Sequence, residues 1–148
     1  MHHPIIPNVI TESEVCGLKR TDTAFEAAQL MHKMNIAALI VTDDNGTLVG
    51  IVTERDLTRR VIAEDKDPHK TKLELIMTGN PETLAPSDST GDALELMRSR
   101  NFRHLPVVDD GRVVGMVSIR DLYSAVKADL EDTVRETEAY VFGDRYGA

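Results

Sequence analysis

Residues 50–57 read GIVTERDL, and sixty-five residues later residues 115–122 read GMVSIRDL. Each phrase runs from a glycine through two apolar residues and a hydroxyl residue to an arginine and an aspartate. The similarity extends outward, since shifting the chain by 66 positions aligns the residues from 22 onward with those from 88 onward. The first turn, which ends at Gly46, has one residue more than the second, which ends at Gly111, and beyond it the offset is 65. Self-similarity at a fixed period indicates a repeated structural unit. The duplication here covers about residues 10–127.

Each unit has the same predicted order of elements: strand, helix, strand, strand, helix. A short strand is expected near residues 17–18 and 83–84, and Asp22 and Asp88 are expected to cap the helices that follow. The next two strands are joined by DDNG in the first unit and DDG in the second, which are typical hairpin turns. The sequence therefore predicts an α+β fold (α/β in the broad sense) with two repeats of this order and a C-terminal helix.

Composition breaks and the ends of the repeat suggest the domain boundaries. We expect a first repeat at residues 5–64, a linker at 65–75, a second repeat at 76–127 and a helical tail at 128–148, helical to about Tyr140. An apolar stripe continues into this tail near helical spacing: Leu122, Val126, Leu130, Val134 and Val141. The stripe could pack on its own domain or form a partner surface.

Composition limits the classes of protein. The chain has 148 residues, of which 41% are apolar and 28% charged, and its formal net charge is −8. That charge disfavours broad binding to nucleic acid or to an anionic membrane, so a bound anion would need a local pocket. The sequence has one cysteine, no apolar run near the ~18 residues of a membrane span and no apolar N-terminal signal segment. We therefore expect a cytoplasmic protein.

The repeated phrase contains groups that suit a phosphate and a sugar. The hydroxyl lies where a strand gives way to a helix, whose first amides lack intrahelical partners and favour an anion. The arginine adds a positive charge, and the aspartate could accept hydrogen bonds from the vicinal hydroxyls of a ribose. These residues are Thr53, Arg55 and Asp56 in the first phrase and Ser118, Arg120 and Asp121 in the second.

A purely structural interpretation of the same residues is open as well. A hydroxyl at the N-cap and an aspartate three residues later form a capping box, which stabilises a helix without any ligand. Capping does not require an arginine at the same place in both copies. The arginines therefore favour a ligand.

Residues 105–122, LPVVDDGRVVGMVSIRDL, combine a proline-led strand, a hairpin, a glycine, a hydroxyl and an aspartate. With the duplication, about residues 5–127 resemble a tandem pair of cystathionine-β-synthase (CBS) domains, also called a Bateman module. The resemblance implies adenosyl ligands, namely AMP, ADP or ATP, with NAD or S-adenosylmethionine as alternatives. It also implies that the two repeats and their clefts are related by a pseudo-twofold axis. In the family the hydroxyl contacts phosphate, the aspartate contacts ribose, and two modules pair, and the resemblance implies the same here.

In similar proteins each cleft takes its base-facing wall from the other repeat. By that rule the stronger site comprises Thr11, Val15, Cys16, Arg103, His104, Leu105, Pro106, Met116, Ser118, Arg120 and Asp121. The weaker site comprises Ala38, Leu39, Ile51, Thr53, Arg55, Asp56, Thr78, Pro81, Glu82 and Thr83. The ranking rests on Arg103 and His104, which could reach a phosphate, whereas the matching residues Ala37 and Ala38 could not. Glu82 would oppose an anion in the weaker site.

No catalytic motif and no metal-ligand spacing of histidines is found, so we expect neither an enzyme nor a metal site. We expect a regulatory adenine-nucleotide sensor that forms a homodimer and acts on an effector protein the sequence does not name. The alternatives are a ligand-free dimerisation or adaptor module and an enzyme acting on ATP or NAD. Much of the dimer contact is expected from the second helices: Leu57, Val61, Leu122 and Val126.

Overall fold

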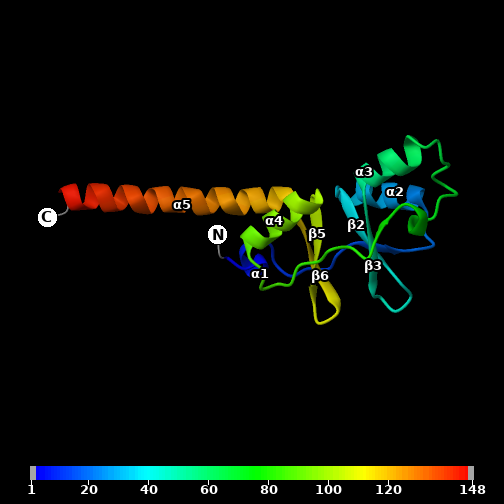
Figure 1. Cartoon of the computed structure of the whole chain (residues 1–148), viewed down its shortest axis with the longest axis horizontal. Coiled ribbons are helices and arrows are strands. Elements are labelled where there is room, and N and C mark those ends of the chain that lie inside the picture. Colours follow the sequence, from blue (N-terminus) through cyan, green and yellow to red (C-terminus); the bar gives the residue numbers. More distant parts are fainter. Residues whose placement is uncertain (1–2, 147–148) are drawn as a thin grey trace.

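The computed structural model describes the backbone of residues 3–146 and the side chains of residues 3–141. The first repeat consists of β1 (Gly17–Lys19), α2 (Ala24–Met34), β2 (Ala38–Thr42), β3 (Leu48–Thr53), α3 (Glu54–Leu57) and the π-helical turn η1 (Thr58–Ile62). The second consists of α4 (Thr90–Arg100), β5 (His104–Asp109), β6 (Arg112–Ser118) and α5 (Ile119–Tyr146). The remaining elements are α1 (Ile5–Asn8), η2 (Leu73–Leu75) and β4 (Thr78–Gly79). The predicted α+β fold with two repeats is confirmed (Figure 1).

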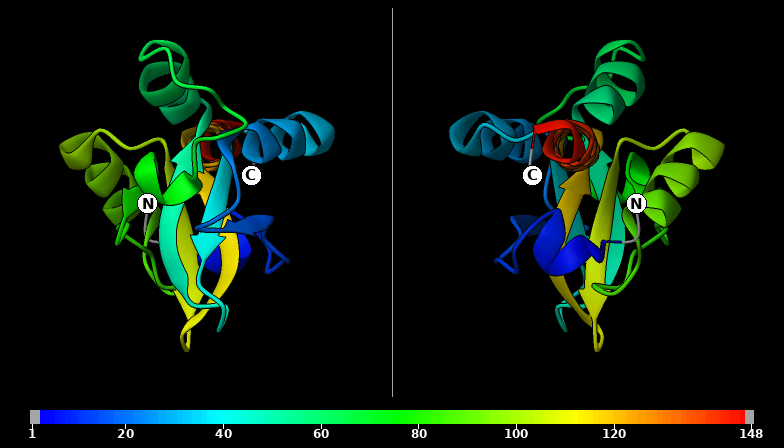
Figure 2. Two further views of the ribbon diagram at one scale, coloured as in Figure 1. Left: turned by 90° about the vertical axis from the view of Figure 1, so that its right-hand side faces the viewer. Right: turned by 90° about the vertical axis from the view of Figure 1, so that its left-hand side faces the viewer.

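The strands form one four-stranded sheet and one hairpin. The sheet has the order β1-β2-β3-β4, with β1 parallel to β2 and the other pairs antiparallel. β5 and β6 form the antiparallel hairpin, which Leu84 extends through a parallel bridge to Val107. Leu84 thus takes the position in the second repeat that β1 has in the first, and it lies where we predicted a short strand, near residues 83–84. Figure 2 shows the strands of both repeats at the centre, with α2 and α4 on opposite sides.

The segment that leads into each repeat crosses to the other repeat. β4 leads into the second repeat but pairs with β3 of the first. In the same way the Ser13 amide donates to the Val114 carbonyl of β6 at 2.9 Å. Ile5 is fully buried in the core of the second repeat, and Leu73, within the segment 65–75 that we expected to be a linker, is fully buried in the core of the first. The two repeats are therefore interlocked.

The crossing explains why a glycine opens the repeated phrase. A Cβ atom at Gly50 would lie 2.4 Å from the sulfur of Met77 and 3.1 Å from the carbonyl oxygen of Thr78. A Cβ atom at Gly115 would lie 2.5 Å from Cδ1 of Ile10. Both obstacles belong to the segment that leads into the other repeat. Glycine is the residue that permits such a close approach.

The caps of the first helices lie one residue beyond the predicted ones. Thr23 caps α2 and Ser89 caps α4, each by accepting a hydrogen bond from the third helical amide. The predicted caps, Asp22 and Asp88, each accept a hydrogen bond of 2.8 Å from the amide three residues earlier. The aspartates therefore close the turn before the helix, and the neighbouring hydroxyl is left to cap it.

The second helix of the second repeat and the predicted tail form one continuous helix, α5, of 28 residues. It extends well past the rest of the molecule instead of folding back onto it (Figure 1). Its helical part continues to Tyr146, beyond the predicted end at Tyr140, and residues 147–148 of the predicted tail lie outside the described residues.

Two of the residues that we expected at a dimer contact are not accessible. Val61 and Leu122 are 1% and 0% exposed, because they face the core of their own repeat. The prediction of a contact through these two side chains is wrong. The exposed apolar side chains of the second repeat lie farther along α5, at Tyr123, Leu130 and Val134.

Candidate functional site

The hydroxyl and the aspartate of each repeated phrase bond to one another. The Thr53 hydroxyl oxygen accepts from the Asp56 amide at 3.2 Å, and Oδ2 of Asp56 accepts from the Thr53 amide at 2.9 Å and hydroxyl at 3.2 Å. Ser118 and Asp121 repeat this arrangement, with Oδ2 of Asp121 accepting at 2.8 and 2.9 Å. The capping boxes that we considered as the structural alternative are therefore present, and both use Oδ2.

A cavity of about 310 Å³ lies beside the first of these pairs. Five residues predicted for the weaker site line it: Ile51, Thr53, Arg55, Asp56 and Thr78. Thr78 reaches this cavity because β4 crosses onto β3. The opposite wall comes from the second repeat and contains Asn101, Phe102, Arg103 and His104. The cavity is thus built by both repeats.

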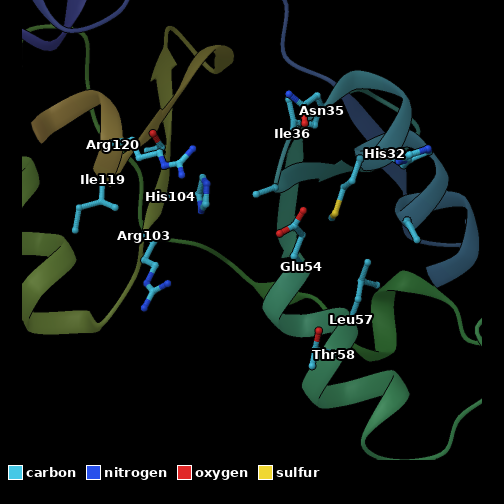
Figure 3. A pocket seen from close by; sticks show the side chains of 14 residues that line it. His32, Asn35, Ile36, Glu54, Leu57, Thr58, Arg103, His104, Ile119 and Arg120 are labelled. Atoms are coloured by element: carbon cyan, nitrogen blue, oxygen red, sulfur yellow. The ribbon is translucent and has the colours of Figure 1, made fainter. Parts of the chain in front are cut away.

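A larger cavity, of about 790 Å³, lies beside Ser118 (Figure 3). Four residues predicted for the stronger site line it: Arg103, His104, Ser118 and Arg120. Across the cavity are side chains of α2, α3 and η1 from the first repeat, including His32, Glu54, Leu57 and Thr58. Asp121 does not line either of these two cavities between the repeats, as far as the described side chains show.

Arg103 and His104 line both cavities. Sequence reasoning assigned them to the cleft of Asp121 alone, because it could not show how closely the two clefts approach each other. Ala37, the counterpart of Arg103 in the first repeat, also lines both cavities but carries no charge. The second repeat therefore supplies a permanent positive charge, on Arg103, and a titratable imidazole, on His104, where the two clefts meet. Glu54 of the first repeat lines both cavities as well and is the opposing charge.

The pKa of His104 is shifted by its place between the repeats. Burial lowers the pKa of this imidazole below its ordinary value of 6.5, and Arg103 lowers it further. Asp121 and Glu54 act in the opposite direction without reversing the shift. The side chain is therefore mainly neutral at pH 7 in the unliganded protein. An anion in either cavity would favour the protonated imidazole.

Other predicted site residues lie away from these cavities. Leu39 and Leu105 are buried in the two hydrophobic cores, and Pro106 is fully buried as well. Cys16 packs against the core of the first repeat. Glu82 lies 3.6 Å from Arg100, so an ion pair balances the charge that we expected to oppose an anion.

The remaining predicted residues also lie outside the two cavity walls. These residues are Thr11, Val15, Ala38, Pro81, Thr83 and Met116. Thr11 and Thr83 are exposed, Ala38 is buried, and the other three are partly buried. Leu39 and Leu105 could reach a cleft only if the hydrophobic cores that contain them were disrupted. The partly exposed ones could contribute only to an extension of the cavities.

Sequence reasoning missed two asparagines at the cavity walls. Asn35 ends α2 and Asn101 ends α4, each in a left-handed conformation with φ of 54° and 57°. Asn35 lines the larger cavity and Asn101 the smaller one. The two align with each other in the duplication, and a left-handed asparagine is a common helix terminator. The alignment of Asn35 with Asn101 in the duplication was therefore the sequence feature that could have identified both residues.

Two features are not found within the described residues. No three histidine, cysteine, aspartate or glutamate side chains are grouped so that they could hold a metal ion. No helix there is both long enough and apolar enough to cross a membrane.

Comparison with known proteins identifies the family. Residues 6–63 and 73–128 match the CBS domain, so this chain belongs to the CBS-domain family and contains a pair of these domains. A protein with CBS domains from Burkholderia ambifaria is 34% identical and has a similar structure, with a TM-score of 0.79 over 86% of this chain and 96% of that one.

Two further relatives bear on function and on length. The CBS domain pair of protein MJ0100, solved in complex with 5′-methylthioadenosine and S-adenosyl-L-methionine, is 31% identical with a TM-score of 0.70, covering 80% of this chain and 93% of that one. The CBS domain-containing protein CBSX3, mitochondrial, of Arabidopsis thaliana is 34% identical over 126 residues, which are 82% of this chain and 61% of that protein. The chain thus spans about three fifths of that relative. CBS pairs are in general regulatory ligand-binding modules.

Proposed function

We propose that this chain is a regulatory module that binds an adenine nucleotide, AMP, ADP or ATP, in the clefts between its repeats, without catalysing a reaction. The observation that carries the proposal is the meeting of both clefts at Arg103 and His104, next to the repeated hydroxyl residues Thr53 and Ser118. A phosphate in either cleft would meet a helix start on one side and the Arg103 guanidinium and His104 imidazole on the other. This combination suits an anion in a protein of net charge −8.

In the smaller cleft we assign the phosphate to the amides at the start of α3 and to Arg55. Oδ2 of Asp56 is engaged in the capping box, and Oδ1 lies 3.7 Å from Nε of Arg60. We assign Oδ1 to the ribose hydroxyls, beside this ion pair. Ile51 is buried in the wall and offers an apolar surface to the base. Thr78, from the crossing strand β4, completes that wall.

In the larger cleft Ser118 and Arg120 take the corresponding places. Asp121 does not line this cavity but holds the Ser118 hydroxyl at its wall, and its contact with the ribose stays a prediction from the resemblance. Arg103 and His104 line both clefts, and the smaller cleft also has Arg55 and Arg60 where the larger has Arg120, so the cations at the walls do not by themselves rank this cleft as the stronger phosphate site. Glu54 lies on the opposite wall and weakens the attraction. The ranking stays a prediction.

NAD or S-adenosylmethionine is the alternative ligand, supported by the adenosyl compounds bound in the MJ0100 domain pair. A ligand-free dimerisation or adaptor module is a second candidate, because the capping boxes give Thr53, Asp56, Ser118 and Asp121 a structural role of their own. An effector protein, a homodimer and a cytoplasmic location remain predictions from the sequence.

The test is a calorimetric titration of the purified chain with AMP, ADP, ATP, NAD and S-adenosylmethionine, each at the same ionic strength. We expect saturable binding of at least one adenine nucleotide, with stabilisation of the folded state by that ligand. No binding and no change in Tm across all five would contradict the proposal and favour the adaptor module. Chromatography of the nucleotides after prolonged incubation would reveal turnover, which would contradict the absence of catalysis.

A further inference from the structure

The outer half of α5 presents an apolar face that the rest of this chain leaves uncovered. Tyr123, Leu130, Val134 and Val141 are 70%, 61%, 54% and 51% exposed, respectively. At 3.6 residues per turn these four positions fall within about 40° of arc, so they form one straight stripe. A shallow groove of about 530 Å³ runs along its first three turns. Side chains on the opposite side of α5 contact the module, as Asp129 does through His3 at 3.1 Å.

The spacing along this stripe is palindromic. The four residues follow one another at intervals of seven, four and seven positions, so the pattern is the same in both directions about residue 132. A second α5 running antiparallel would therefore place Tyr123 against the partner's Val141, and Leu130 against the partner's Val134. Two identical patches that fit each other about a twofold axis define an isologous contact.

The charges beside the stripe have the same symmetry. Lys127, Glu131, Arg135 and Glu138 lie along one flank and are all exposed. In an antiparallel twofold pair this flank lies beside the same flank of the partner, which brings Lys127 near the partner's Glu138 and Arg135 near the partner's Glu131. In a parallel pair the flank would instead meet the other side of the stripe, where Val126, Thr133 and Thr137 lie nearest to the stripe. The acidic residue farther round on that side, Asp129, contacts His3 of the module. The charges thus favour the antiparallel arrangement.

We propose that α5 is a self-association helix, which pairs antiparallel with α5 of a second copy of this chain about an axis near residue 132. The paired length, from Tyr123 to Val141, is about 27 Å at a rise of 1.5 Å per residue. A single helix pair of this length is smaller than a standard interface of roughly 800 Å² per partner. The association is therefore reversible and concentration-dependent. It leaves both clefts of each module outside the contact and does not depend on a nucleotide.

Analytical ultracentrifugation of the full chain without nucleotide tests the proposal. We expect a particle of 16.4 kDa at low micromolar concentration and one of twice that mass at hundreds of micromolar. Leu130→Lys should abolish the dimer while circular dichroism stays unchanged, because this side chain is exposed and lysine forms helix about as well as leucine. Ile62→Lys is the matched control, since Ile62 is 68% exposed on the first repeat, away from α5. It should dimerise as the wild type does.

A charge exchange tests the antiparallel register. Lys127→Glu and Glu138→Lys should each weaken the dimer about tenfold, since each pair occurs twice in a twofold dimer. The double variant should restore the wild-type dissociation constant. A chain that stays monomeric at all concentrations, a dimer lost on Ile62→Lys but not on Leu130→Lys, or a double variant no better than the single ones would each overturn the proposal.

Discussion

The most informative substitution for the proposed function is Arg103→Ala, because this side chain lies at the wall of both cavities. If both clefts bind phosphate, the substitution must weaken two binding events at once. Arg55 lines only the smaller cavity and Arg120 only the larger one. Arg55→Ala and Arg120→Ala should therefore each weaken a single, different event. This contrast separates a shared cation from one that belongs to either cleft.

The size of the effect follows from the exposure of the side chain. A hydrogen bond to a charged group contributes about 1.5–3 kcal/mol when it is well shielded from solvent. Arg103 is exposed in the unliganded structure, so solvent screening reduces this figure toward the ~1 kcal/mol of an exposed ion pair. We expect the dissociation constant for AMP or ADP to rise about five- to tenfold at each cleft. Adenosine has no phosphate, and its affinity should not change.

Isothermal titration of ADP and of adenosine into each variant measures these changes. Arg98→Ala is the control for net charge, because Arg98 is exposed on α4 and pairs with Glu95 away from both cavities. If Arg103→Ala affects binding no more than Arg98→Ala does, the shared phosphate site is wrong. If it weakens only one event, the two clefts do not share this cation. An equal loss for adenosine would indicate a structural effect of the substitution.

Three further predictions concern the clefts, the crossing and pH. Asp121→Ala should weaken the tighter nucleotide-binding event roughly 10- to 150-fold in titration calorimetry, and our ranking is wrong if Asp56→Ala removes that event instead. Gly50→Ala should lower the free energy of unfolding in urea by about 1–3 kcal/mol. Gly115→Ala should lower it less, because a Cβ atom at Gly50 would meet a backbone oxygen as well as a side chain, whereas one at Gly115 would meet side chains alone. Equal losses for the two variants would contradict this reason. Burial keeps the pKa of His104 lower in the folded state than in the unfolded state. As pH falls below 6.5, the unfolded state therefore binds a proton that the folded state does not bind. The free energy of unfolding declines until the pH passes the folded-state pKa. His104→Gln should lose less stability than the wild type between pH 7.5 and 5.5, and identical losses would contradict the assignment.

The sequence alone predicted the features of this protein that are local along the chain. The order of helices and strands follows from hydrophobic periodicity, and the hairpin turns follow from their glycines and aspartates. The aligned phrases 50–57 and 115–122 predicted where each strand meets a helix, and Thr53, Asp56, Ser118 and Asp121 stand at those junctions. Short-range geometry links these residues, since the hydrogen bonds between them span only three positions.

Only the tertiary structure decided which distant residues meet. No local pattern indicates that Ile5 completes the core of the second repeat or that Leu73 completes that of the first. It assigned Arg103 and His104 to one cleft, but packing of the two hairpins brings these residues to the wall of both. It also allowed the tail to fold back, whereas α5 extends into solvent with its apolar stripe uncovered. Periodicity shows which face of an element is apolar, but which surface covers that face depends on how all the elements pack together.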